Sequence, residues 1–228
     1  MTATFGMFVK FPEPGRVKTR LAAAIGDEWA TRLYIAFLID LIPRYSELRA
    51  RRVLAYSPND EVTRRYFEHL SQGAYELWPQ PAGPLSWRMQ IFFETFGPQP
   101  TVLIGSDSPT LAMFEVEYAL QRLQVVDCVL GPAMDGGLYL IGLKGGPWPI
   151  FSKVRWSTSR VLEQVLAEVR HYGAAVEMLP LWYDVDTLDD VNFLRGHLAA
   201  LKISQPNMFP DLGQTEIMLD VIDGRPVV

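Results

Sequence analysis

Three groups of charged and small residues follow apolar segments of this sequence, and the first is a basic loop at residues 11–21. Its prolines restrict the backbone, and the cations Arg16, Lys18 and Arg20 stand at alternate positions. Alternate side chains of an extended segment point to one side, and arginine and lysine bind phosphate oxygens. Pairing with surface acids is the alternative, but a position after the first expected strand favours phosphate. The predicted substrate-binding residues here are Pro14, Gly15, Arg16, Lys18 and Arg20.

The second group centres on Asp107, in the loop at residues 105–111 that follows the apolar run 101–104. Its small neighbours, Ser106 and Ser108, leave room beside the carboxylate. A single carboxylate suits Mg²⁺ or Mn²⁺, because such a cation takes few protein oxygens and leaves its other positions to water and phosphate. An Asx turn or a helix cap is the alternative use of an aspartate at this point. We predict Asp107 as the metal ligand and Ser106 as a substrate-binding residue.

The third group begins at Asp135, which precedes two consecutive glycines. Glycine lets the backbone approach a ligand closely, and a tight turn into the next strand is the alternative. We predict Asp135 as a candidate proton acceptor in catalysis, and Gly136 and Gly137 as substrate-binding residues.

Two further acids, Asp184 and Asp186, belong to the same group. They lie two residues apart, so in an extended segment they face the same way. Either is a candidate catalytic proton acceptor, and the pair is suited to sharing a cation. The alternative is structural, because Thr187 and Asp190 have the spacing of a capping box for the last expected helix.

Alternating strand-like and helix-like segments must position these groups. The alternation predicts a three-layer α/β/α fold with a mostly parallel sheet covered on both faces, and ligands bind beyond the carboxyl ends of the strands in such sheets. The expected strands are residues 4–9, 52–56, 74–78, 101–104, 126–131, 138–143 and 175–179. The expected helices are residues 27–43, 60–69 (capped by Asn59), 85–96, 114–124, 158–172 and 188–201.

The composition bounds the class of protein. The 228 residues are 49% hydrophobic and 21% charged, as in a folded globular chain. The net charge of −5 without a dense basic stretch argues against nucleic acid as a partner. No apolar run reaches the roughly 20 residues that span a bilayer, no signal peptide is recognisable, and the single cysteine, Cys128, fits a reducing compartment. A cytoplasmic location is therefore expected.

Residues 1–202 are predicted to form one domain, and residues 203–228 a C-terminal extension. Residues 216–222, followed by Asp223-Gly224, are interpreted as an appended strand and turn that packs on the edge of the sheet. The extension is also a candidate contact between the subunits of a homo-oligomer.

Five segments, in this order, resemble a bacterial family of glycosyltransferases with the GT-A-type fold of nucleotide-diphospho-sugar transferases. They are residues 11–21, 104–111, 131–143, 156–158 and 182–187. The family is similar in turn to guanylyltransferases that build phospholactate-type cofactors. The resemblance implies a mixed sheet of about seven strands, with the strand after Gly137 reversed. It also implies a nucleotide over the first strand and a metal at Asp107.

Two positions depart from the pattern of this family. Met134 stands where the family commonly has a glutamate, and Ser86-Trp87 stand where it usually has a glycine and an acid. Both changes are expected to bear on the pocket for the sugar or the acceptor. The basic loop and the acids singled out above match the pattern.

These features predict metal-dependent transfer of a glycosyl group from a nucleoside-diphosphate sugar to an acceptor that the sequence does not identify. Nucleotidyl transfer, in which a phosphorylated acceptor attacks a nucleoside triphosphate and releases pyrophosphate, would use the same metal and cations. Sugar nucleotidyltransferases of this fold generally have a glycine-rich first loop. The prolines at 12 and 14 therefore favour glycosyl transfer. A non-catalytic nucleotide-binding protein is the third hypothesis.

Overall fold

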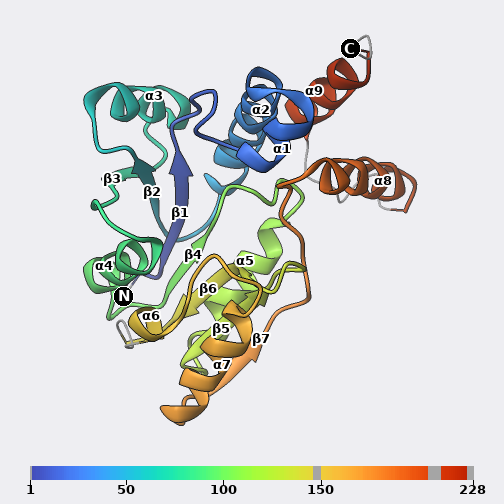
Figure 1. Ribbon diagram of the computed structural model, residues 1–228. Helices are drawn as coiled ribbons and strands as arrows, with labels where there is room; N and C mark the ends of the chain where they lie inside the picture. The colour runs from blue at the N-terminus through green and yellow to red at the C-terminus, as the bar shows by residue number, and fades with distance from the viewer. Residues whose placement is uncertain (1, 146–149, 205–211, 225–228) are drawn as a thin grey trace.

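A seven-stranded mixed sheet forms the centre of the computed structural model, which describes residues 2–145, 150–204 and 212–224 (Figure 1). The strand order is β3-β2-β1-β4-β6-β5-β7. Strand β6 runs antiparallel to β4 and β5, and the other neighbouring pairs are parallel. The predicted sheet with one reversed strand after Gly137 is therefore confirmed. The strands are β1 Thr4–Lys10, β2 Arg51–Ser57, β3 Glu76–Pro79, β4 Thr101–Ile104, β5 Cys128–Pro132, β6 Leu138–Leu143 and β7 Val176–Met178.

Helices cover both faces of the sheet and complete the predicted three layers. Side chains of α2, α3, α5 and α8 belong to the core on one face, and those of α4, α6 and α7 to the core on the other. The described helices are α1 Thr19–Ile25, α2 Asp27–Tyr45, α3 Glu61–Ser71, α4 Leu85–Phe96, α5 Met113–Arg122, α6 Ile150–Lys153, α7 Val161–His171, α8 Leu188–Ser204 and α9 Gly213–Asp223.

Strand β4 shows why the apolar runs of the sequence form the middle of the sheet. All four of its residues are buried. Val102 and Ile104 pack into one core cluster and Leu103 into the other, because successive side chains of a strand point to opposite faces. A strand covered on both faces has no polar side and reads as a continuous apolar run. Asp107 follows the last residue of this strand by three positions, so it lies at the carboxyl ends of the strands.

The C-terminal extension differs from the predicted edge strand, because residues 216–222 lie within helix α9. Thr215, Leu219 and Ile222 are its buried positions, and this spacing is helical. The helix packs on α2, whose Asp40 accepts hydrogen bonds from the main-chain N–H groups at the start of α9. Asp40 thereby satisfies donors that a helix start leaves free. Contact with a second subunit stays a prediction.

Two local predictions in the first half of the chain were also wrong. Asp60, and not Asn59, caps α3, because its carboxylate accepts from the main-chain nitrogen of Thr63 at 2.7 Å. Residues 19–25 form helix α1 where the sequence pattern indicated only a loop. The first difference is a shift of one residue, the scale at which assigned helix boundaries vary, whereas α1 is a helix of seven residues that the sequence pattern did not indicate.

Across the residues that the structure describes, no helix has the length and apolarity needed to cross a membrane.

Candidate active site

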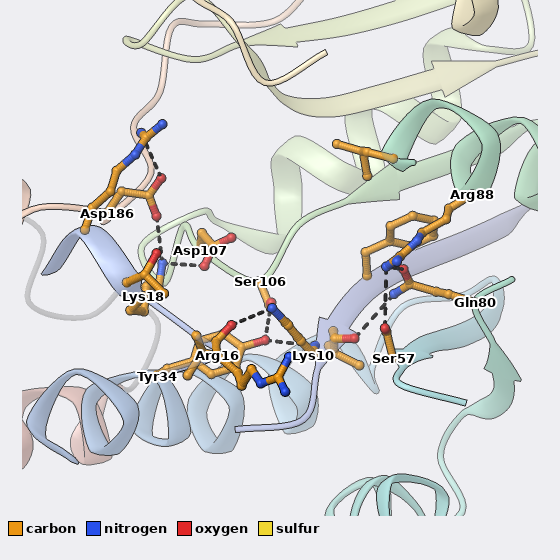
Figure 2. A pocket seen from close by; sticks show the side chains of 16 residues that line it. Lys10, Arg16, Lys18, Tyr34, Ser57, Gln80, Arg88, Ser106, Asp107 and Asp186 are labelled. Atoms are coloured by element: carbon orange, nitrogen blue, oxygen red, sulfur yellow. Dashed lines mark hydrogen bonds and ion pairs between the residues drawn. The ribbon is translucent and has the colours of Figure 1, made fainter. Parts of the chain in front are cut away.

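Three adjoining clefts open along the carboxyl edge of the sheet. The basic cleft, of about 330 Å³, lies over the ends of β1 and β2 (Figure 2). The apolar cleft, of about 300 Å³, lies over β4 and β6, and the acidic cleft, of about 400 Å³, lies beside the start of α8. Asp107 lines both the basic and the apolar cleft, and Asp184 lines both the apolar and the acidic cleft. The predicted acids therefore meet where the clefts adjoin.

The cations are distributed unevenly among the clefts. The apolar cleft has none among its described lining residues, and the acidic cleft has only Arg20. Pro14 and Gly15, predicted to bind substrate, do not line the basic cleft. Five cations line the basic cleft: Lys10, Arg16, Lys18, Arg20 and Arg88.

The first loop brings its cations to the basic cleft by a different geometry from the predicted one. The loop is not extended, because Lys18 has a left-handed backbone conformation and residue 19 begins α1. The side chains of Arg16 and Arg20 are 71% and 68% exposed, whereas that of Lys18 is 2% exposed. The expected alternation onto one side was wrong, although all three cations reach the same cleft.

Lys18 lies beneath the acids rather than on the surface of the loop. Its ammonium forms ion pairs with Asp107 and, at 3.2 Å, with Asp186. It also donates to the main-chain oxygen of Val185 at 2.8 Å. Burial by itself would lower the pKa of Lys18, but the charges of Asp107 and Asp186 raise it above its ordinary value. Lys18 is therefore a charged, fully paired group at neutral pH.

The loop after β4 is joined to the segment before α8. The main-chain nitrogen of Val185 donates to the main-chain oxygen of Asp107 at 2.9 Å. The hydroxyl of Ser108 donates to the carboxylate of Asp184, and Thr110 donates to the hydroxyl of Tyr183 at 3.0 Å. These bonds bring together two groups of predicted site residues that are far apart in the sequence.

Asp184 has the perturbed pKa that is typical of a group poised for proton transfer. Its burial raises the pKa to about 6. The hydrogen bond from Ser108 lowers the pKa, and the negative charge of Asp107 raises it. Asp184 is therefore mostly ionised above pH 6, and it lies at the junction of the apolar and acidic clefts.

Asp186 forms ion pairs with cations, whereas Asp190 accepts hydrogen bonds from the main chain before α8. Asp186 pairs with Lys18, and Arg20 lies 3.8 Å from it. Asp190 accepts hydrogen bonds from the main-chain nitrogens of Asp186 and Thr187, at 3.0 and 2.8 Å. The alternative reading of Thr187 and Asp190 as a capping box for α8 is thereby confirmed.

Asp135 and its two glycines form a tight turn between β5 and β6. Asp135 accepts from the main-chain nitrogen of Gly137 at 2.7 Å. Gly136 has a φ of +86°, and a Cβ added there would lie 2.0 Å from the main-chain oxygen of Ser159. The close approach predicted for this glycine is therefore to the chain itself. Of the pair, Gly137 but not Gly136 lines the apolar cleft.

The Gly136→Ala variant is expected to lose about 2 kcal/mol of the free energy of unfolding, from backbone strain and the contact with Ser159. Urea unfolding measures this loss. Gly73→Ala is the matched control, because Gly73 has a φ of +79° and no atom within 4 Å of an added Cβ. It should lose only about 1 kcal/mol, from backbone strain alone. Equal losses would show that the contact with Ser159 carries no energy.

Comparison with known proteins agrees with this architecture. Residues 44–158, half of the chain, match the family described as "Uncharacterized protein conserved in bacteria (DUF2064)". The chain belongs to the DUF2064 family. No curated protein matches its sequence.

A solved structure extends the similarity of this DUF2064 chain to its full length. It is a proposed nucleotide-diphospho-sugar transferase from Desulfovibrio desulfuricans, 31% identical, with a TM-score of 0.85 over 98% of this chain and 96% of the other.

Two more distant structures share the fold. A nucleotidyl transferase from Methanothermobacter is 11% identical, with a TM-score of 0.59 over 87% of this chain and 98% of the other. A cytidylyltransferase from Leptospira borgpetersenii is 13% identical, with a TM-score of 0.52 over 100% of this chain and 99% of the other.

The donor atoms of the DUF2064 chain limit the kind of metal site that it offers. Within the described ranges, no group of three or more His, Cys, Asp or Glu side chains is placed to hold a metal. Mg²⁺, however, commonly binds through one or two carboxylates and completes its shell with water and substrate phosphates. The side chain of Asp107 is 44% exposed at the meeting of two clefts. Asp107 therefore fits a cation that arrives with a phosphate ligand, and not one held by the protein alone.

Three residues that line the basic cleft were not among the site residues predicted from the sequence: Ser57, Gln80 and Arg88. Gln80 is buried and donates to the main-chain oxygens of Val9 and Ala55, at 3.3 and 2.7 Å. Arg88, on α4, donates to Ser57 and to Gln80 (Figure 2). Ser57 is the last residue of β2 and Gln80 follows β3, so the rule that ligands bind at the carboxyl ends of strands would have found them. Arg88 comes from a helix, and no local pattern marks it.

A second missed contact supports Ser106. The hydroxyl of Tyr34, on α2, lies 2.9 Å from the hydroxyl of Ser106 and accepts from the main-chain nitrogen of Lys10 at 3.1 Å. Burial raises the pKa of Tyr34 well above its ordinary value, so this hydroxyl stays protonated. The contact fixes Ser106 in the wall of the basic cleft.

Proposed function

We propose that this protein transfers a glycosyl group from a nucleoside-diphosphate sugar, with a divalent cation at Asp107. The observation that carries the proposal is the distribution of charge along the sheet edge. Five cations line the basic cleft, whereas the described lining of the adjoining apolar cleft has three carboxylates and no cation. Phosphate needs such cations, and a sugar ring does not. The diphosphate belongs in the basic cleft and the uncharged group beside it.

Asp107 lines both the cleft proposed for the diphosphate and the cleft proposed for the sugar. Arg16 and Arg20 are exposed side chains that line the basic cleft, and they would bind the diphosphate oxygens. A divalent cation bound at Asp107 would supply Lewis-acid stabilisation of the charge that develops on the leaving diphosphate. Trp156 is a half-buried aromatic side chain that lines the apolar cleft, and an aromatic ring of this kind suits the apolar face of a sugar.

Asp184 is the group best suited to accept the proton of the acceptor hydroxyl. A general base works best when its pKa lies near the working pH, and that of Asp184 is raised to about 6. Its position between the apolar and acidic clefts lets an acceptor approach from the side opposite the diphosphate. Asp186 is less suited because it pairs with Lys18. Asp135 is held in its turn by Gly137.

Nucleotidyl transfer is the competing reaction, and two of the proteins that share the fold carry that activity in their names. Its acceptor is a phosphorylated molecule, which would have to enter a cleft lined by carboxylates. The repulsion between like charges disfavours such an acceptor. Glycosyl transfer to a hydroxyl group does not meet this difficulty.

A thermal-shift screen of nucleotides and nucleotide-sugars, with and without Mg²⁺ or Mn²⁺, tests the proposal. A ligand that binds only the folded state raises the melting temperature by mass action. We expect the largest shift from a nucleoside-diphosphate sugar with metal, followed by release of the nucleoside diphosphate in a turnover assay. Release of pyrophosphate from a triphosphate would identify a nucleotidyltransferase instead. Binding without any turnover would indicate a non-catalytic protein.

Replacement of Arg16 or Arg20 with alanine is expected to raise the Kd for the nucleoside diphosphate about tenfold, since each removes one charge-assisted hydrogen bond. Isothermal titration calorimetry measures this change. Arg65→Ala is the control, because Arg65 pairs with Glu61 on α3 and lines none of the three clefts. An unchanged Kd in both cleft variants would place the diphosphate elsewhere.

A further inference from the structure

Lys18 has an unusual backbone conformation for its residue type. It is the residue before α1, with φ 48° and ψ 40°. This left-handed conformation disfavours side chains other than glycine, asparagine and aspartate, so surrounding contacts must hold it. The conformation turns the side chain inward, where it is 2% exposed and lies 5.9 and 5.6 Å from the rings of Tyr34 and Phe37.

The ammonium group of Lys18 is saturated by the protein. A lysine has three N–H donors and no acceptor. The structure gives it three acceptors. Two are the carboxylates of Asp107 and Asp186 (Figure 2), and the third is the main-chain oxygen of Val185. A phosphate could bind Lys18 only by displacing one of these. In this structure Lys18 therefore acts on the acids, and not as a free phosphate ligand.

The charge balance around Asp107 depends on this one lysine. Lys18 pairs with Asp107 and Asp186, the charge of Asp184 interacts with all three of these groups, and Arg20 lies 3.8 Å from Asp186. Two cations against three carboxylates leave one net negative charge. Without Lys18 there would be two, in a partly buried place where charges interact more strongly than in water.

We propose that Lys18 couples metal binding to diphosphate binding, so that the divalent cation binds tightly only together with the diphosphate. With Lys18 present, the acids attract a free cation weakly. A diphosphate in the basic cleft adds the negative charge that the cation needs. By linkage, the cation strengthens diphosphate binding by the same factor. This coupling rests on the proposed function, because it takes Asp107 as the metal ligand and the basic cleft as the diphosphate site.

Binding of Mn²⁺ to the full-length protein, with and without inorganic pyrophosphate, tests the coupling. Electron paramagnetic resonance measures the free cation. For the wild-type protein we expect pyrophosphate to tighten Mn²⁺ binding about tenfold or more, within the usual range of coupling between sites. For Lys18→Met, Mn²⁺ alone should bind about tenfold more tightly than to wild type, and the gain from pyrophosphate should fall to about threefold or less.

Two further variants keep the test decisive if Lys18→Met folds poorly. Asp186→Asn leaves Lys18 with one carboxylate fewer to neutralise, so Mn²⁺ alone should bind more weakly than to wild type. Arg65→Met removes an exposed cation that pairs with Glu61 and lines none of the three clefts, and should leave Mn²⁺ binding unchanged. Thermal melting checks the folding of each variant.

The coupling is overturned if folded Lys18→Met binds free Mn²⁺ no better than wild type, or if Asp186→Asn binds it more tightly. It is also overturned if pyrophosphate has no effect on the wild-type protein. The proposed function fails separately. If the coupling is observed but no nucleotide-sugar is turned over, the cation site stands and glycosyl transfer does not. If glycosyl transfer is observed without coupling, Lys18 has only a structural role.

Discussion

The Asp107→Ala variant is expected to lose about 1,000-fold in kcat/KM for the nucleotide-sugar donor, because a bound cation supplies several kcal/mol of transition-state stabilisation. The stabilisation of the folded protein by nucleotide should also become independent of Mg²⁺ and Mn²⁺. Both effects follow from the position of Asp107, which is shared by the basic and apolar clefts. Steady-state kinetics and thermal shifts with and without metal measure them.

Asp220→Ala is the matched control for this variant, because Asp220 is an exposed aspartate on α9 that lines none of the three clefts. It should keep wild-type kinetics and metal dependence. Asp107→Asn separates charge from shape, since it retains the size of the side chain and one oxygen. We expect it to resemble the alanine variant in metal dependence. Metal-dependent turnover in Asp107→Ala would show that the cation is held elsewhere.

The sheet could be predicted from the sequence because its central strands are local runs of apolar residues. Strand β4 has three consecutive apolar residues, Val102 to Ile104, after Thr101, and a pattern of that kind does not depend on distant contacts. The reversed strand β6 came from the family resemblance, since periodicity does not give direction. Helix α9 was misread because Ile217, Leu219 and Val221 alternate, whereas only Leu219 of these is buried. An alternating apolar run is ambiguous until the surface that it packs on is known.

The candidate site was predictable as a set of residues and not as an arrangement. Strand ends marked Arg16, Lys18, Asp107 and Asp184, and all four line the adjoining clefts. The contact between the loop after β4 and the segment before α8 joins main-chain and side-chain groups far apart in the sequence, so no local spacing reveals it. The inward turn of Lys18 depends on a single left-handed residue.

The Asp184→Asn variant is expected to lose about 100-fold in kcat/KM, the usual contribution of a general base. The wild-type profile of kcat/KM against pH should fall below about pH 6, because kcat/KM reports the free enzyme and the pKa of Asp184 is raised to about 6 there. The variant should lack this acid limb. A full acid limb in the variant would assign the proton transfer to another group, such as Asp135.

The same substitution is expected to stabilise the protein without ligand. The pKa of Asp184 is about 6 in the folded protein, against 3.8 as the reference value. Between pH 4 and 6 the unfolded chain loses this proton while the folded protein retains it. The contribution of Asp184 to stability therefore falls as pH rises through this window, by about 3 kcal/mol. Asparagine does not titrate, so at pH 7.5 the variant should be more stable than wild type by about that amount.

Urea unfolding at pH 7.5 and at lower pH measures this gain, which should shrink as the pH falls toward 4. Asp189→Asn is the control, because Asp189 is an exposed acid in the first turn of α8. Its charge is favourable at a helix start, so its loss should be slightly destabilising at pH 7.5. A gain for Asp184→Asn together with a loss of turnover would mean that burial of this carboxylate costs stability and places its pKa where proton transfer needs it. No gain at pH 7.5 would mean that the folded protein solvates the charge, and the raised pKa and the role as base would both have to be given up.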